Sequence, residues 1–178
     1  MTTIGLARGT VQVVQYQPGW RDLFAQEALL LRSVMGQEAL EIEHIGSTSL
    51  EGMPAKPIID LMVAVPDLTR AQRWLPRLEE LTYEWRPERD VPDRLFFAKG
   101  PRNQRTHHLS LAERTSNFYQ SKLLFRDFLR QHRDAFVEYQ LLKLQLAKQH
   151  AQDRASYTKG KEAFVERILE LAKENYEG

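Results

Sequence analysis

Residues 39–65 read ALEIEHIGSTSLEGMPAKPIIDLMVAV, and this stretch decides the fold. It contains two β-prone segments, residues 39–45 and 57–65, on either side of a polar turn at residues 46–49. The second segment is apolar at every position except Asp60. Such a run is typical of a central strand that is buried on both faces. The stretch therefore predicts a β-sheet whose interior strand carries one carboxylate.

Hydrophobic periodicity and turn residues predict the elements around this stretch. A helix begins at Pro18 and ends at Gly36. A second helix is capped by Asp67 or Thr69 and runs to Leu81. Further strands are expected over residues 11–16, 94–99 and 105–111, with a turn at residues 100–103 between the last two.

From Ser116 to the end of the chain the pattern is helical, in three segments broken near Asp134 and again at residues 153–156. The fold class we predict is α/β (α+β), a mixed β-sheet of about four or five strands with flanking helices and a C-terminal helical unit. A length of 178 residues fits one domain. We therefore expect a single domain over residues 1–178, with a mixed α/β core at 1–112 and the C-terminal helices at 113–178.

The composition excludes several classes of site and partner. The chain has no cysteine, so any metal must be held by carboxylate, imidazole or hydroxyl groups. Its 25 basic and 24 acidic residues nearly balance, which argues against nucleic-acid binding. No apolar run suits a signal peptide or a membrane span. We expect a cytoplasmic protein that binds neither nucleic acid nor membrane, and the sequence leaves its oligomeric state open.

A turn that begins with Gly46 and Ser47 and is followed by an acidic strand residue suits phosphate chemistry. The glycine lets backbone N–H groups approach phosphate oxygens, and the Ser47 hydroxyl adds a donor. Asp60, thirteen residues after Ser47, would hold a divalent cation, Mg²⁺ or Mn²⁺, that bridges the phosphates. The alternative is a buried structural Asp60 that is satisfied by Lys56 or by backbone donors.

Longer motifs make the sequence similar to a known family. Around the turn they are Glu43-His44-Ile45-Gly46-Ser47-Thr48-Ser49, then Gly52, then Ala55-Lys56-Pro57-Ile58-Ile59-Asp60. Elsewhere they are YQPGW at residues 16–20, RTHHL at 105–109, FRDFLR at 125–130, LK at 142–143, and YTK at 157–159 with Lys161. Together these segments resemble the signature of the GrpB family, also designated UPF0157, over nearly the whole chain. The resemblance implies a nucleotidyltransferase-like fold, and related domains occur fused to dephospho-CoA kinase.

Two departures from the expected patterns bear on the site. Nucleotidyltransferases of this fold usually carry a paired Asp-x-Asp, but Ile58 or Met62 stands where the partner of Asp60 would be. One carboxylate of a metal pair is therefore missing, which argues against ordinary two-metal transfer. The family pattern His-His-Leu-His is also broken, because Ser110 takes its last position.

Other polar side chains could complete the site. Glu43 lies on the strand that leads into the turn, and the alternation of residues 105–111 puts His108 on a polar face of its strand. We predict that Asp60, Glu43 and His108 form a mixed carboxylate and imidazole site with catalytic and metal-binding roles. For His107 and His108, the alternative is a structural strand histidine.

Basic residues of the C-terminal helices could neutralise phosphates. Lys122, Arg126, Arg130 and Arg133 recur along one helix face, a pattern that is usually a solvated face. Arg126 is the exception, because it lies between two phenylalanines of the motif, and we predict that it reaches inward.

Lys161 recurs with Tyr157, Phe164 and Ile168 on the helix stripe that is expected to face the core. An ammonium group in that position needs an anion. Either a bound phosphate or a carboxylate such as Asp127 would supply it.

These observations favour an enzyme that depends on a divalent metal, binds a nucleoside triphosphate and transfers its nucleotidyl group to an unknown small acceptor. The predicted nucleotide- and phosphate-binding residues are Gly46, Ser47, Thr48, Ser49, Lys56, Arg126 and Lys161. The alternative is a non-catalytic nucleotide-binding module linked to coenzyme A metabolism.

Overall fold

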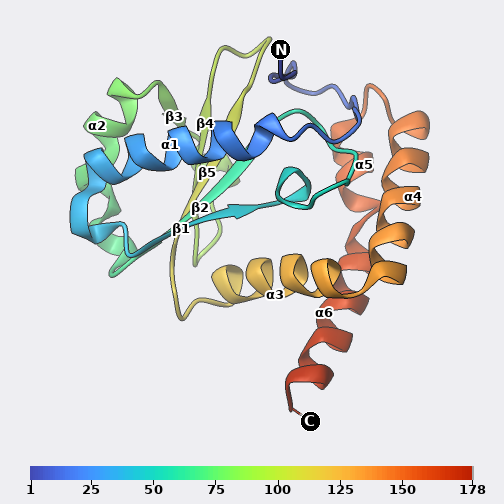
Figure 1. The fold of residues 1–178 in the computed structure, drawn as a ribbon. Coiled ribbons are helices and arrows are strands. Elements are labelled where there is room, and N and C mark those ends of the chain that lie inside the picture. Colours follow the sequence, from blue (N-terminus) through green and yellow to red (C-terminus); the bar gives the residue numbers. More distant parts are fainter. Residues whose placement is uncertain (178) are drawn as a thin grey trace.

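The computed structural model describes residues 1–177, which form a five-stranded sheet with helices on both faces (Figure 1). The strands are β1 (Glu41–Ile45), β2 (Ile59–Val65), β3 (Tyr83–Trp85), β4 (Leu95–Lys99) and β5 (His107–Glu113). The helices are α1 (Gly19–Met35), α2 (Leu75–Glu80), α3 (Asn117–Gln131), α4 (Arg133–Gln149), α5 (Arg154–Lys159) and α6 (Glu162–Glu177). Short 3₁₀ helices lie at Gly36–Glu38, Ser47–Ser49, Leu68–Trp74 and Pro87–Arg89.

The sheet is mixed, with the strand order β1-β2-β5-β4-β3. β2 and β5 run parallel, whereas the other neighbouring pairs are antiparallel. Asp60 is the direct neighbour of Ile45 on β1 and of His108 on β5. Directly opposed residues share a face of the sheet. The turn after β1, Asp60 and His108 therefore meet at one end of the central strands.

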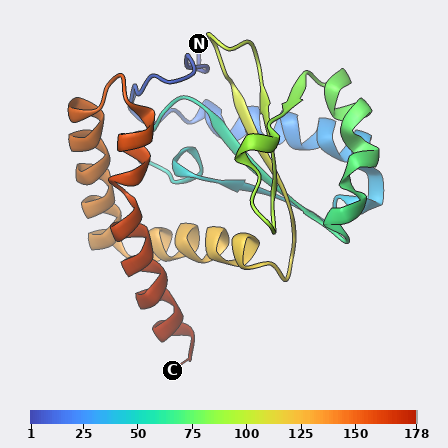
Figure 2. The same ribbon diagram turned by 180° about the vertical axis from the view of Figure 1, so that it is seen from behind.

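Helices cover both faces of β2, as its apolar sequence predicts. α1 lies across one face (Figure 1), where Leu61, Val63 and the fully buried Trp20 belong to the largest core cluster. On the opposite face, Tyr119 of α3 packs with Met62 in a second cluster. α6 crosses α3 on the far side of the molecule (Figure 2). No helix among residues 1–177 is both long and apolar enough to cross a membrane.

The predicted mixed α/β fold is confirmed, and the ends of the helix over residues 19–35 and of four predicted strands shift by only one or two residues. The strand expected over residues 11–16 is wrong. In the described chain this segment pairs only at Val14, which forms an isolated bridge with Ala55. Pro54 and Pro57 lie close to that bridge and lack the N–H groups needed to extend a ladder.

Two helical predictions also need correction. The helix expected from Asp67 or Thr69 to Leu81 is divided into a 3₁₀ helix and α2, because Pro76 has no N–H group to donate. Asp67 is the cap, since its carboxylate accepts from the Thr69 N–H group at 2.9 Å. The last C-terminal segment is divided at Gly160 into α5 and α6. The sequence does not predict β3, because three residues are too few to show a period.

Candidate functional site

A cavity of about 520 Å³ opens between the sheet and the helices α3, α5 and α6. Asp60 of β2 and His108 of β5 lie on its floor, and the turn with Ser47 forms one edge. The structure thus brings these three residues together in one concave site, as the sequence predicts. The other predicted site residues that line the cavity are Gly46, Thr48, Lys56, Arg126 and Lys161.

Gly46 sets how closely the turn approaches Asp60. Its φ of 70° lies in the left-handed region, which L side chains rarely adopt. A Cβ atom built on Gly46 would lie 2.5 Å from Oδ2 of Asp60. The carboxylate therefore occupies the space that a side chain would fill, and the contact requires glycine.

Asp60 and His108 form a hydrogen-bonded pair on the cavity floor. Nδ1 of His108 lies 2.9 Å from Oδ1 of Asp60. Burial raises the pKa of Asp60, but the hydrogen bond from His108 and the charges of Lys56 and Arg154 outweigh burial and lower the pKa below its usual value. Asp60 is thus an ionised acceptor at neutral pH, and His108 is the donor. The Asp60 side chain is 37% exposed, so it presents its carboxylate to the cavity.

Six basic side chains of the cavity are not paired with acids. Among the side chains of residues 1–175, no carboxylate oxygen lies within 4.0 Å of their charged nitrogens. The six are Lys56, Arg89, Arg94, Lys122, Arg154 and Lys161. Three carboxylates line the cavity with these six cations, namely Asp60 on the floor and Glu162 and Glu166 of α6, so positive charge is still in excess. Such an excess favours a ligand that carries several negative charges.

Lys56 and Lys161 lie against the same aromatic ring. Their Nζ atoms lie 5.0 and 4.5 Å from the centre of the Tyr157 ring. Burial and the charges of Arg154 and Lys161 lower the pKa of Lys56 to about 7. Burial also lowers the pKa of Lys161 to about 8. Both lysines thus lie beside an aromatic ring rather than beside a carboxylate. A bound polyanion would reduce the repulsion between the two ammonium groups.

The structure does not bring Glu43 to Asp60. Oε2 of Glu43 accepts a hydrogen bond from Nη1 of Arg126 at 2.6 Å. Among the side chains that the structure describes, those of residues 1–175, no three acidic or histidine groups are placed to share a metal ion. The predicted grouping of Asp60, Glu43 and His108 is therefore not found, because an arginine of the covering helix α3 takes up the Glu43 carboxylate.

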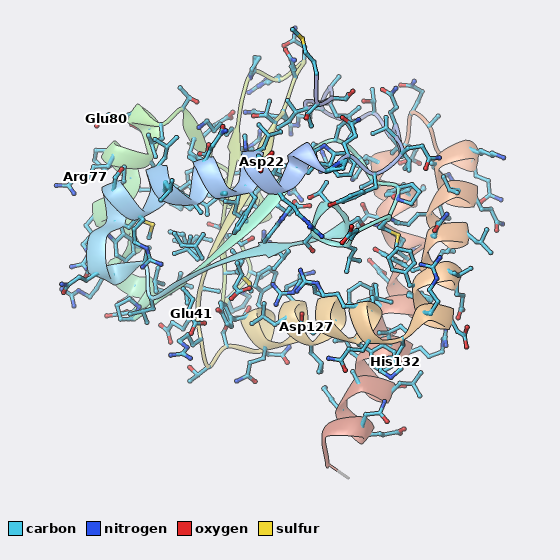
Figure 3. All side chains as sticks on the ribbon, in the orientation of Figure 1. Asp22, Glu41, Arg77, Glu80, Asp127 and His132 are labelled. Carbon is cyan, nitrogen blue, oxygen red and sulfur yellow. The ribbon has the colours of Figure 1, made fainter. Side chains whose placement is uncertain are left out.

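Arg126 reaches inward, as the sequence predicts, but its donors are already occupied. Besides Glu43, it contacts Asp127 with 2.8 Å between Nε and Oδ1, and it donates to the His44 carbonyl at 3.0 Å. Figure 3 shows Asp127 on α3, the helix that also carries Arg126. Because Asp127 is bound to Arg126 and to Arg130, it is not the anion that meets Lys161.

Thr48 and Ser49 stabilise the turn. The Thr48 hydroxyl lies 2.9 Å from Nε2 of His44 and is buried. The Ser49 hydroxyl donates to the Gly46 carbonyl at 2.6 Å, outside the cavity lining. Among the turn hydroxyls, Ser47 is therefore best placed for the predicted phosphate contact.

His107 lies on the opposite face of the sheet from His108. Its Nε2 atom is 3.9 Å from Oε2 of Glu27, beneath α1. Burial lowers the pKa of His107 to about 4, so the ring is neutral at physiological pH. This position agrees with the alternative that His107 is a structural strand histidine.

Sequence patterns do not single out Arg89, Arg94 and Arg154 as cavity residues. Arg89 ends a three-residue 3₁₀ helix, Arg94 lies just before β4, and Arg154 begins a six-residue helix. Such short elements show no periodicity that could assign a face. The signal that could have found Arg94 is its position two residues before Phe96, whose ring lies 5.0 Å from the Arg94 guanidinium carbon.

The chain is similar to proteins of one family. Residues 10–171 match the family model described as GrpB protein. The crystal structure of conserved protein GrpB from Enterococcus faecalis has a TM-score of 0.85 and 34% identity, and the match covers 94% of this chain and all of that one. Glutamate-rich protein GrpB of Alkalihalophilus pseudofirmus is 32% identical over 93% of this chain and 98% of its own length.

Other relatives are longer. UPF0157 protein YqkA of Bacillus subtilis is 36% identical over 92% of this chain, which spans only 47% of that protein. A dephospho-CoA kinase of Mycolicibacterium paratuberculosis is 29% identical over 80% of this chain and 41% of its own length. Because the family model matches residues 10–171 of 178, the chain belongs to the GrpB family.

Proposed function

We propose that the cavity binds a nucleoside triphosphate and that the protein transfers the nucleotidyl group to a small acceptor. The observation that carries this proposal is that three unpaired cations, Lys56, Arg154 and Lys161, line one cavity with the Ser47 turn and the Asp60 carboxylate. Nucleotide phosphates bring several negative charges into one place. The cavity volume of about 520 Å³ also lies within the range of about 300 to 1,000 Å³ that is usual for small-molecule sites.

The lining residues suggest a role for each side of the site. Backbone N–H groups of the turn and the Ser47 hydroxyl would bind phosphate oxygens. Lys56, Arg154 and Lys161 would neutralise the phosphate charge.

Asp60 alone suits a metal ion that is shared with the ligand. Mg²⁺ is usually held by one or two carboxylates together with phosphate oxygens and water. The exposed carboxylate of Asp60 would supply one such ligand, and Mg²⁺ or Mn²⁺ held there would neutralise part of the phosphate charge. The surrounding cations disfavour a free divalent ion, so we expect the metal to bind only with the nucleotide.

The proposed reaction is an in-line displacement at the α-phosphorus. An acceptor oxygen forms a bond to the α-phosphorus, and the bond from that atom to the oxygen bridging to the β-phosphate breaks. Pyrophosphate leaves with the electron pair, and the acceptor proton passes to water. Lysine and arginine side chains around Asp60 stabilise the charge that develops on the phosphate oxygens.

The second candidate is a non-catalytic nucleotide-binding module. It is favoured by the absence of a second carboxylate beside Asp60 on the sheet, since Glu43 is paired with Arg126 and Met62 is fully buried. A link of this module to coenzyme A metabolism would rest on similarity to part of a dephospho-CoA kinase.

Calorimetric titration with ATP, inorganic triphosphate and dephospho-CoA, each with and without Mg²⁺, separates the two candidates. If the protein is the proposed transferase, ATP should bind more tightly with Mg²⁺ than without it. Label from α-³²P ATP should then appear in a new small molecule when cell extract supplies the acceptor. If the protein is a non-catalytic module, Mg²⁺ should not strengthen ATP binding, and no label should be transferred. Absence of binding by every phosphate compound would contradict both.

Lys161→Met is expected to weaken ATP binding by about 10-fold while the protein stays nearly as stable as the wild type. Methionine retains an apolar stem against Tyr157, and the lost ammonium group has no carboxylate partner among the described residues. Affinity is measured by calorimetry and stability by urea denaturation. Lys148→Met, an exposed charge change on α4, is the matched control and should alter neither quantity. Loss of stability with unchanged affinity would remove Lys161 from the site.

Binding of triphosphate is expected to take up protons near pH 8. The pKa values of Lys56 and Lys161 are lowered to about 7 and about 8, so both lysines are partly neutral at that pH. A bound polyanion raises both pKa values, and each lysine then gains a proton. The binding enthalpy should therefore depend on the ionisation enthalpy of the buffer at pH 8. Near pH 6 both lysines are already charged and no longer contribute to proton uptake. A buffer-independent enthalpy at pH 8 would contradict the proposed role of the two lysines.

A further inference from the structure

We infer that the acceptor of the proposed transfer carries a phosphate group, and that this group binds to a cationic wall formed by Arg89, Arg94 and Lys122. The inference rests on the proposed function, because it names the class of the second substrate. It concerns a part of the cavity that the nucleotide phosphates, held at the turn and beside Tyr157, do not require.

The wall is a stack in which cations alternate with aromatic rings. The guanidinium carbons of Arg89 and Arg94 lie 4.0 and 5.0 Å from the centre of the Phe96 ring. The Arg94 guanidinium carbon also lies 5.1 Å from the centre of the Phe118 ring, and Nζ of Lys122 lies 5.3 Å from the same ring. Two rings thus hold three cations in a row, and all five side chains line the cavity.

Nearby carboxylates do not neutralise this wall directly. Oδ1 of Asp90 accepts from the Phe96 N–H group at 2.7 Å, and Oδ2 of Asp93 accepts from the Phe118 N–H group at 2.8 Å. The two acids therefore position the backbone that carries the rings. Arg94 donates from Nη2 to the Arg89 carbonyl, and its buried Nε has no hydrogen-bond partner in the described chain. The wall therefore keeps hydrogen-bond donors that no protein acceptor uses, and a bound anion needs such donors.

The sheet order separates the Phe96 ring of the wall from the turn that holds Ser47. The turn with Ser47 follows β1, whereas Phe96 lies on β4, and the paired strands β2 and β5 lie between them. Phe96 is the direct neighbour of Ser110, two residues from His108, so it shares the face of the Asp60–His108 pair. An anion on the wall and a triphosphate at the turn would therefore flank Asp60 from two sides, as two substrates of one transfer must.

Three cations favour a dianion over a monoanion. A phosphomonoester carries nearly two charges at neutral pH and three acceptor oxygens. Two of the wall residues are arginines, whose planar donor forks suit phosphate oxygens. A single carboxylate would leave most of this charge uncompensated.

The test is a titration of inorganic phosphate into protein saturated with the α,β-methylene analogue of ATP and Mg²⁺. The wild type is expected to bind one phosphate in addition to the analogue. Lys122→Met should weaken that phosphate by about 10-fold and Arg89→Gln by a similar factor, while affinity for the analogue changes less than about 2-fold. Both side chains are exposed, so the variants should fold, and Lys148→Met is again the charge control.

The outcomes separate the two proposals. If the analogue binds but the saturated protein takes up no phosphate, the inference is overturned and the proposed function stands. If the analogue does not bind, the proposed function fails, and phosphate alone is titrated into the free protein and its variants. Binding of phosphate at two sites, one weakened by Lys122→Met and the other by Lys161→Met, would still support a separate phosphate site at the wall. A single phosphate site that both variants weaken would overturn the inference. Malonate that binds to the wall as tightly as phosphate would also overturn the choice of a phosphate ligand.

Discussion

Asp60→Asn is expected to reverse the effect of Mg²⁺ on ATP binding. In the wild type, Mg²⁺ bound to Asp60 and the phosphates should strengthen binding by about 10-fold or more. In the variant the charged metal ligand is lost, and Mg²⁺ should weaken binding because it masks phosphate charge from the surrounding cations. Free ATP should bind the variant severalfold more tightly than the wild type, since the one floor carboxylate among six cations is gone.

The same variant is expected to remain folded. Asparagine keeps the shape that fits against Gly46 and can still accept the hydrogen bond from His108. The pKa of Asp60 is lowered by the fold, so the carboxylate adds stability above its unfolded pKa. Because the side chain is 37% exposed and solvent screens its charge, the variant should lose only about 1 kcal/mol or less at pH 7. Asp134→Asn, on the exposed first turn of α4, is the control. A wild-type response to Mg²⁺ in Asp60→Asn would show that Asp60 holds no metal.

Arg126→Met is expected to destabilise the protein by about 3 kcal/mol, because it strands acceptors that one guanidinium now satisfies. These acceptors are the Glu43 carboxylate, the Asp127 carboxylate and the His44 carbonyl. Arg126→Lys should restore only part of the loss, since an ammonium group cannot reproduce the planar donor fork. The free energy of unfolding is measured by urea denaturation.

Arg130→Met is the matched control for this variant. Arg130 pairs with the same Asp127, at 3.1 Å, but its side chain is 44% exposed. The expected loss is below about 1 kcal/mol, as for surface ion pairs in general. ATP affinity should change little in Arg126→Met, in contrast to Lys161→Met. Native stability combined with a large loss of ATP affinity would instead assign Arg126 to the phosphates.

The parts of the fold that follow from local sequence are those with a long pattern. The apolar run of β2 and the spacing of α1 each extend over enough residues to show a period. The misplaced strand at residues 11–16 has β-prone residues, but its neighbours at residues 54–57 are too rich in proline to pair with it. β-propensity describes the segment itself, and a strand also needs a partner.

Only part of the candidate site could likewise be predicted from local sequence. Gly46, Ser47 and Asp60 come from two adjacent segments, so their meeting follows from a simple strand, turn and strand order. The pairing of Glu43 with Arg126 joins residues 83 positions apart and depends on how α3 crosses the sheet. No spacing rule contains that information. Most of the cations of the cavity likewise come from short or irregular segments that tertiary packing places around Asp60.

The central claim is that the cation-lined cavity around Asp60 is the nucleotide site, and amide chemical shifts of the ¹⁵N-labelled protein during titration with ATP and Mg²⁺ test it most directly. The account predicts saturable shifts that are largest at Gly46, Ser47, Arg154 and Lys161, all of which line the cavity. Residues on the opposite face of the sheet, such as Glu27, should be unaffected. Saturable shifts centred on that opposite face, or no saturable shifts at all, would contradict the account.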